Sequence, residues 1–266
     1  MTQFFTSPVV YDWPRRRIQT AGEMPGAAGL LEEARRPVNI FSQFQIAGDS
    51  LKSNGKESTP WQDFLPWVRF HFPGLSFHSM VDMTLAVESD LGSGGNHASS
   101  PHCVEVSYWV IRIAHLMGFD NFTRETLGLA AFFHDIGKCL VPAGVLSKPG
   151  PLDEHEWGYL DLHPALGAAL TAETEDGLRL SPIIAAHHEH YDGRGYPLGL
   201  QGEEIPLGAR IITVVDAFDV MTRDRCYRKA PGKAAALEEL QRNKGAQFDP
   251  EVVEAFVALL AVENPA

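Results

Sequence analysis

Apolar residues recur at helical spacing through the C-terminal two thirds of the chain. One run begins a turn after His102, and its members are four, three and four residues apart: Val106, Val110, Ile113 and Met117. Leu127, Ala131 and His134 show the same spacing. Because side chains three or four residues apart share one side of an α-helix, both runs predict helices with an apolar side. In both, a histidine is in line with that side.

Helix boundaries are indicated by prolines, glycines and one capping pattern. Asp153 and Glu156 have the spacing of a capping box, which predicts a helix start at this point. Pro182 predicts the start of a helix that carries His187 and His188. Further helices are predicted over 208–222, from Pro231 to Gly245, and from Pro250 to Ala261.

No segment reads as a convincing strand, so the expected fold class is all-α. The helical pattern covers residues 79–266, which we predict to form one domain. Residues 1–78 show no clear periodicity and contain a polar stretch at 48–60, so we predict a small N-terminal region of unclear fold. Aromatic residues from Trp61 to Phe70 fall at helical spacing and are interpreted as core or as a docking face.

Composition and charge restrict the class of partner. The 266-residue chain has a net charge of -12, which is poorly suited to holding a nucleic-acid backbone, so no nucleic-acid partner is expected. Its three cysteines form no CxxC pair, which favours a reducing compartment over a disulfide scaffold or a thiolate zinc site. There is no signal-peptide pattern and no apolar run of the roughly 18 residues that a membrane span needs. These features predict a cytoplasmic protein without a membrane span.

Histidines and aspartates occur at five separated places on or beside the predicted helices. Most of them project from an apolar side, where an uncompensated polar group would be costly. A bound cation would compensate them, and ligation by imidazole and carboxylate suits iron, manganese or zinc. The candidate ligands are His102, His134, Asp135, His163, His187, His188 and Asp216.

Two of these places are doublets, His134–Asp135 and His187–His188. Neighbouring residues on a helix point about 100° apart, so one metal would struggle to use both members of a doublet. Two neighbouring metals could share them. A single histidine is more often a structural residue, but the whole set in this order favours a two-metal site.

Several stretches in a fixed order carry a resemblance to a known family. FFHDIGK at 132–138 is followed by HHEHYDGRGYP at 187–197 and RIITVVDAFDVMT at 210–222. Together with HPALG at 163–167 and RCYRKA at 225–230, they make the chain from about His102 onward resemble the HD-GYP phosphodiesterases, a branch of the HD superfamily. The resemblance implies a helical HD-superfamily bundle with a C-terminal GYP extension. It also implies two or three bound metals, often iron or manganese.

The resemblance assigns roles to individual residues. It implies a first metal bound by His102, His134, Asp135 and Asp216. Asp135 would bridge to a second metal, completed by His163, His187 and His188. Asp135 and Lys138 are the expected catalytic residues, with Lys138 on the scissile phosphate. The positions that match substrate contacts or pocket residues are Lys138, Tyr196, Asp219, Arg225 and Arg228.

Three positions depart from the family pattern, and one of them is His190, which stands where an arginine is common after HHE and is interpreted as a non-ligand. A glutamate that supplies a third metal in some members is replaced by Ala98, so two divalent metals are expected, iron or alternatively manganese. Cys226 stands where a proline is usual in the RPYR-like motif, which could soften the turn but removes no ligand.

The activity implied by the resemblance is hydrolysis of cyclic di-GMP to linear pGpG, GMP or both, by a hydroxide that two metals activate. Regulatory proteins would bind the N-terminal region or the GYP loop, which is residues 195–197, since family members often carry input domains before the catalytic one. Two alternatives stay open. One is a catalytically silent sensor or interaction module for cyclic di-GMP, and the other is an HD phosphohydrolase that acts on another nucleotide or cyclic dinucleotide.

Overall fold

Helices make up the regular secondary structure of the part of the chain that the structure describes. The structure is a computed structural model, and it describes residues 75–90, 101–148, 150–174, 177–223, 230 and 232–263. Within these ranges no β-strand occurs, only an isolated bridge between Lys244 and Phe248. The predicted all-α fold class is therefore confirmed. The aromatic residues from Trp61 to Phe70, Ala98, Arg225, Cys226 and Arg228 lie outside the described residues.

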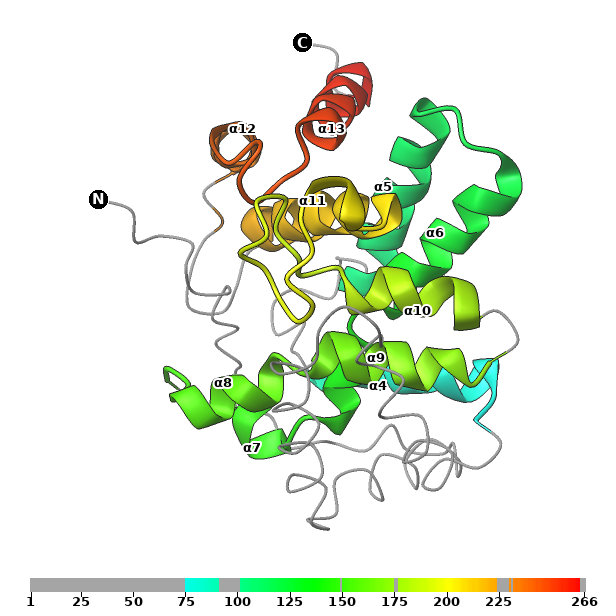
Figure 1. Cartoon of the computed structure of the whole chain (residues 1–266), viewed down its shortest axis with the longest axis vertical. Helices are drawn as coiled ribbons and strands as arrows, with labels where there is room; N and C mark the ends of the chain where they lie inside the picture. Colours follow the sequence, from blue (N-terminus) through cyan, green and yellow to red (C-terminus); the bar gives the residue numbers. More distant parts are fainter. Residues whose placement is uncertain are drawn as a thin grey trace.

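The two apolar runs nearest the start of the predicted domain form a pair of helices. They are α5 (His102–Leu116) and α6 (Asn121–Phe133), which lie side by side with their apolar sides buried (Figure 1). α6 begins where the Asp120 carboxylate accepts a hydrogen bond of 2.7 Å from the backbone N–H of Thr123. Both helices were predicted from periodicity, and both are confirmed.

The next pair, α9 (His163–Ala172) and α10 (Gly177–Ala185), packs closely along its length. A Cβ on Gly177 would lie 1.7 Å from the carbonyl oxygen of Thr171, so only glycine lets α10 begin this close to α9. The prediction that Pro182 opens this helix is wrong, because Pro182 lies inside α10. Packing against α9 extends the helix ahead of the proline and overrides the local signal.

The C-terminal part contains α11 (Leu207–Thr222), α12 (Lys233–Arg242) and α13 (Pro250–Glu263). α11 is buried on nearly all sides, because it contacts α5, α10, α12 and α13. Arg210 of α11 donates a hydrogen bond of 2.5 Å to the carboxylate of Asp249, which precedes α13. The three predicted helices are confirmed, although α12 is shorter at its C-terminal end than the sequence indicated.

The remaining elements are four short helical segments and α4, a longer helix that the sequence pattern did not predict. In chain order these elements are α4 (Phe77–Asp90), η2 (Ile136–Leu140), α7 (Ala143–Leu146), α8 (Glu154–Leu160) and η3 (Gly202–Glu204). α8 begins with the predicted capping box: Asp153 accepts from the Glu156 N–H at 2.9 Å, and Glu156 accepts from the Asp153 N–H at 2.8 Å. α7, α8 and the segment between them have their own small apolar cluster, separate from the main core.

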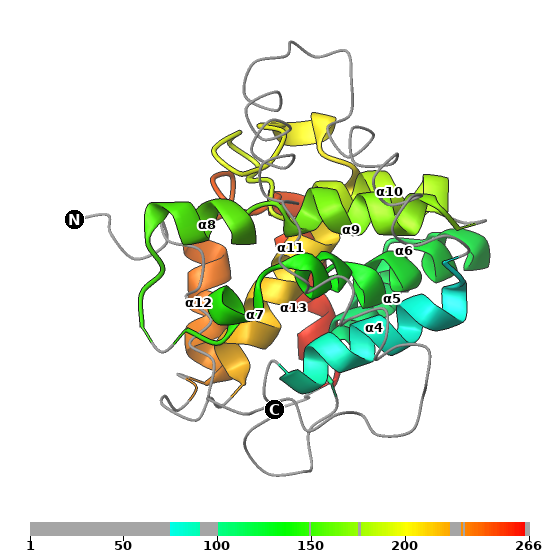
Figure 2. The ribbon, with the colours of Figure 1, turned by 90° about the horizontal axis from the view of Figure 1, so that it is seen from below.

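The packing brings together residues that are far apart in the sequence. In Figure 1 α9 lies below α10 and α11 lies above α10, and Figure 2 shows α4, α5 and α6 running alongside each other. The main core extends through all of these helices and includes Met80, Val110, Phe133, Ile212 and Phe256. Among the described residues, no helix combines the length and the apolar character that crossing a membrane requires.

Candidate metal centre

The structure brings all seven predicted metal ligands together. His102 is the first residue of α5, His134 follows α6, His163 begins α9, the His187–His188 doublet follows α10, and Asp216 lies in α11. One group of ligand atoms within 4.8 Å of one another comes from Asp135, His163, His187 and His188. A second such group comes from His102, His134 and Asp135. Asp216 joins the second group, since its Oδ1 lies 3.1 Å from His102 Nε2.

Three of the histidines are oriented in the same way. The Nδ1 atoms of His134, His163 and His187 each lie 2.7 Å from the carbonyl oxygen three residues earlier. A carbonyl oxygen only accepts hydrogen bonds, so each Nδ1 carries the proton and donates it. Each Nε2 of a neutral ring then presents a lone pair, which is the state that a metal requires.

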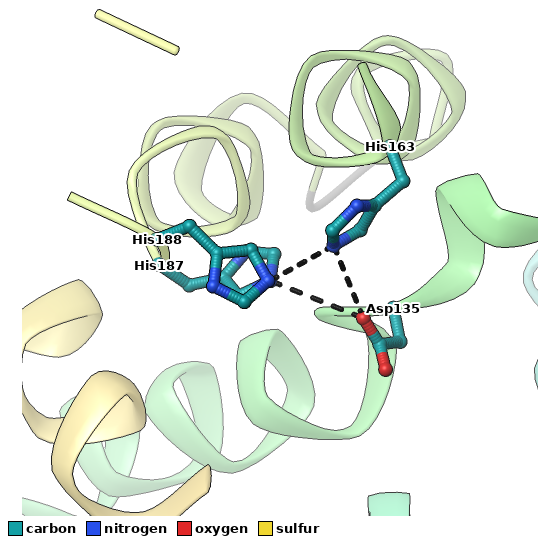
Figure 3. Close-up of side chains that lie close together, drawn as sticks. All are labelled: Asp135, His163, His187 and His188. Atoms are coloured by element: carbon teal, nitrogen blue, oxygen red, sulfur yellow. Dashed lines mark hydrogen bonds and ion pairs between the residues drawn. The ribbon is translucent and has the colours of Figure 1, made fainter. Parts of the chain in front are cut away.

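The lone pairs of two of these histidines face each other. Figure 3 shows the ring of His163 opposite His187, with their Nε2 atoms 3.3 Å apart. Nε2 of His134 is buried and makes no hydrogen bond within the described residues. Acceptor atoms placed in this way repel one another unless a cation lies among them. The donor set therefore fits divalent metals.

Asp135 connects the two groups of ligands. Its Oδ1 lies 3.2 Å from His163 Nε2 and 4.0 Å from His187 Nε2. Its Oδ2 lies 3.5 Å from His134 Nε2 and accepts a hydrogen bond of 2.5 Å from the Lys138 ammonium. Burial alone would raise the pKa of Asp135, but Lys138 and the neighbouring histidines hold this pKa well below its usual range. The carboxylate is therefore ionised, with one oxygen toward each ligand group.

Burial controls the protonation of His187 and His188. The pKa values of His187 and His188 lie well below that of an ordinary histidine, first because the rings are buried and then because other histidines surround them. The pKa of His163 is lowered too, again first by burial. These rings are neutral near pH 7, as metal ligation requires.

His102 is oriented by side chains instead of a carbonyl of its own segment. Its Nδ1 lies 2.6 Å from Oδ2 of Asp219, while its Nε2 faces Asp216. Burial lowers the pKa of His102, but the two carboxylates outweigh this effect and raise it to about 10. Burial raises the pKa of Asp216, and hydrogen bonding to His102 outweighs this and lowers it to about 2. A proton on Nε2 thus competes with a metal for this position.

The GYP loop lies directly against the second ligand group. The ring of Tyr196 stacks on the ring of His188, with centroids 5.0 Å apart and planes 22° apart. The Tyr196 N–H donates to the His188 carbonyl at 3.2 Å. A Cβ on Gly195 would lie 2.2 Å from the backbone nitrogen of His190, so the loop needs glycine to turn this tightly. Burial raises the pKa of Tyr196 well above its usual value, which keeps the phenol protonated.

Glu189 supports the loop beside the site, a role that its sequence position did not predict. Its buried carboxylate accepts backbone hydrogen bonds from Leu198 at 2.5 Å, Gly199 at 3.0 Å and Leu200 at 3.1 Å. It thereby fixes the loop that follows Tyr196 to the segment that carries the two histidines. The only available signal was its place between HH and the GYP loop in HHEHYDGRGYP.

The structure describes some of the predicted substrate residues and not others. Lys138 is buried and contacts Asp135. Asp219 contacts His102, and it accepts a second hydrogen bond from Arg223. Arg225 and Arg228 lie outside the described residues, so their contacts with a substrate stay predictions.

The fold is a helical bundle, and its buried histidines and aspartates surround an adjacent His–Asp pair. This arrangement is typical of metal-binding helical domains. The family model for the HD domain matches residues 81–252. The chain therefore belongs to the HD domain family, and its relatives confirm the resemblance to the HD-GYP branch.

Two relatives and one solved structure illustrate this similarity. The chain is 40% identical over 147 residues to the cyclic di-GMP phosphodiesterase response regulator RpfG of Xanthomonas campestris, covering 54% of this chain and 39% of that protein. It is 36% identical over 158 residues to 3'3'-cGAMP-specific phosphodiesterase 2 of Vibrio cholerae, covering 59% of this chain and 30% of that protein. An HDG"Y"P protein from Bdellovibrio bacteriovorus has the same fold, with a TM-score of 0.50, 17% identity, and coverage of 88% of this chain and 77% of that one.

Proposed function

We propose that this protein is a metal-dependent phosphodiesterase that hydrolyses cyclic di-GMP to linear pGpG, GMP or both. The observation that carries the proposal is the buried Asp135 carboxylate, which has one oxygen toward each group of ligands and accepts a hydrogen bond from Lys138 on Oδ2. Relatives that are named cyclic di-GMP phosphodiesterases support the choice of substrate. The chain spans 30% to 39% of the length of the two relatives described above, so the activity of the whole protein belongs to the proposal.

The proposed cofactors are two divalent metals, iron or alternatively manganese. His102, His134, Asp135 and Asp216 would hold the first, and Asp135, His163, His187 and His188 the second. When bound, such a pair lowers the pKa of a water so that it can attack near pH 7, and it neutralises charge on the phosphoryl oxygens.

The side chains around the metals would prepare the site for a phosphodiester. Lys138 keeps an ammonium group on Asp135, where it orients the carboxylate and would stabilise an oxyanion at the scissile phosphate. The carbonyl bonds to Nδ1 hold His134, His163 and His187 in the ligating tautomer before any metal arrives. The site therefore needs little rearrangement to bind metal.

Local positive charge would allow an acidic chain to bind an anionic dinucleotide. The chain has a net charge of -12, but the metals and Lys138 would concentrate positive charge at the site. Arg225 and Arg228 would add to it, with Asp219 organising the pocket. Tyr196 stacks on His188 at the edge of the centre and would line the nucleotide pocket beside it.

The test of the proposal is a variant in which His134 and Asp135 are both replaced by alanine. Loss of hydrolysis, with the helical content unchanged by circular dichroism, is the expected result. Full activity in this variant would rule out the metal mechanism. Cyclic di-GMP binding without product in the wild-type protein, reconstituted with iron or manganese, would instead select the sensor alternative.

A second candidate substrate has a specific observation in its favour. Two of the relatives are named 3'3'-cGAMP-specific phosphodiesterases, at 36% and 38% identity. The same assay should therefore compare cyclic di-GMP with 3'3'-cGAMP and with other nucleotides. We expect a higher kcat/KM for cyclic di-GMP, and a preference for 3'3'-cGAMP would reassign the substrate within the same chemistry.

The remaining proposals concern the rest of the chain. We propose that residues 1–78 form a regulatory or interaction region and residues 79–266 the catalytic domain. Regulatory proteins would bind the N-terminal region or the GYP loop. The cytoplasmic location predicted from the sequence stays a prediction.

A further inference from the structure

One carboxylate oxygen at the end of α11 receives two hydrogen bonds. Oδ2 of Asp219 lies 2.6 Å from Nδ1 of His102 and also accepts a hydrogen bond from Nε of Arg223, one helical turn further on. The Asp219 side chain is buried, whereas the Arg223 side chain is 26% exposed. The three residues form a series that runs from the protein surface to a predicted metal ligand.

This arrangement differs from that of the other histidines. His134, His163 and His187 are held by backbone carbonyl groups three residues earlier in the chain, and the backbone fixes those carbonyls. His102 is instead held by a side chain from another helix. A side-chain carboxylate rotates about two single bonds, so it fixes the ring only if it is itself fixed.

We propose that Arg223 is a positioning residue for the first metal subsite, acting through Asp219 on the orientation of His102. The inference rests on the metal site of the proposed function but not on the identity of the substrate. The role of Arg223 is to hold the Asp219 carboxylate in the one orientation that directs His102 Nε2 toward Asp216.

The chemistry of the two partners suits this role. The Nε–H of a guanidinium points in a fixed direction in the plane of the group, so its hydrogen bond constrains the angle of the carboxylate as well as its distance. Loss of a residue that orients a ligand typically weakens metal binding by about 10- to 100-fold. Because Arg223 acts one contact further away, we expect about a tenfold effect.

Metal binding without substrate tests this inference. Calorimetric titration of the metal-free full chain with Mn²⁺ should show two equivalents for the wild-type protein. Arg223→Met keeps most of the side-chain volume and should weaken one equivalent about tenfold while sparing the other. Arg223→Lys, which keeps the charge but not the planar group, should recover part of the loss. Arg242→Met is the matched control, since Arg242 pairs with Glu239 on α12, away from the site, and its titration should equal the wild type.

A double-mutant cycle shows whether the effect passes through Asp219. In an Asp219→Ala background, Arg223→Met should cause no further loss of Mn²⁺ affinity. The inference is overturned if Arg223→Met binds both equivalents as the wild type does, or if its effect stays the same size without Asp219. A wild-type chain that binds no Mn²⁺ would overturn the metal site and this inference together, so the two failures are distinguishable.

Discussion

Nε2 of His163 and Nε2 of His187 lie 3.3 Å apart, and neither carries a proton when the rings are neutral, because each Nδ1 donates to a carbonyl. A cation held by these two rings would replace this repulsion with attraction. Metal should therefore stabilise the fold as well as supply the chemistry. At a free metal concentration 100 times the Kd, the expected gain in the free energy of unfolding is about 2.7 kcal/mol per site.

Replacing His187 with alanine should remove the second metal. We expect the Mn²⁺ stoichiometry to fall from two to one, and the rise in Tm on adding Mn²⁺ to shrink accordingly. Calorimetry and thermal unfolding measure the two effects. His155→Ala, which removes a histidine paired with Tyr159 on the exposed side of α8, should change neither. Two equivalents bound at wild-type affinity by the His187 variant would contradict the assignment of this ligand.

Replacing Lys138 with methionine should separate catalysis from metal binding. The change keeps the volume of a buried side chain but removes the ammonium group that donates to Asp135 Oδ2. We expect kcat to fall about 100-fold or more, because a stabilising donor at the phosphate is lost, while the metal content stays at two. Lys244→Met, which removes a lysine paired with Glu254 instead, is the control. Activity within about twofold of the wild type would remove Lys138 from the mechanism.

Replacing Glu189 with glutamine should loosen the GYP loop. Three backbone N–H groups point at the Glu189 carboxylate, and an amide NH₂ would oppose at least one of them. The expected cost is about 1 to 3 kcal/mol of unfolding free energy, with a higher KM and unchanged metal content. Hydrogen exchange should show faster exchange for the amides of residues 198–200. Unchanged exchange at these amides would contradict the role assigned to Glu189, and Glu204→Gln at the exposed end of η3 is the control.

The stability of the metal-free protein should depend on pH through His102 and Asp216. The pKa of His102 is raised to about 10, so its stabilising contribution is complete below about 6.5 and is lost as the pH rises through 10. The pKa of Asp216 is lowered to about 2, so its contribution is present above 3.8 and is lost as the pH falls toward 2. The advantage of the wild type over His102→Gln should therefore shrink between pH 6.5 and 9. Urea unfolding of both proteins with chelator present measures it, and a constant difference would disprove the ion pair.

The helices that frame the centre could be predicted because their sequences have local signals. α5 and α6 follow from regular apolar spacing, and α8 from the capping box at Asp153 and Glu156. The ligand set could be assembled because histidines and aspartates at the ends of apolar helices are unusual without a cation. The family resemblance then assigned an order to them.

Features that depend on tertiary packing could not be predicted. Pro182 lies inside α10 because α10 packs against α9, which no local pattern reveals. Glu189 looks like a surface residue in the sequence, and only the fold of the loop shows that it is buried under three N–H donors. The contact between Asp219 and His102 joins residues 117 positions apart, so it too appears only in three dimensions.

The most direct test of the central claim is metal analysis and product chromatography on the anaerobically purified wild-type protein. Two metals per chain, with linear pGpG or GMP appearing from cyclic di-GMP, is the result we predict. A chain that takes up no metal even when iron or manganese is supplied would contradict the assignment of His187, His188 and the other ligands. It would leave the buried lone pairs at the centre without the cation that they require.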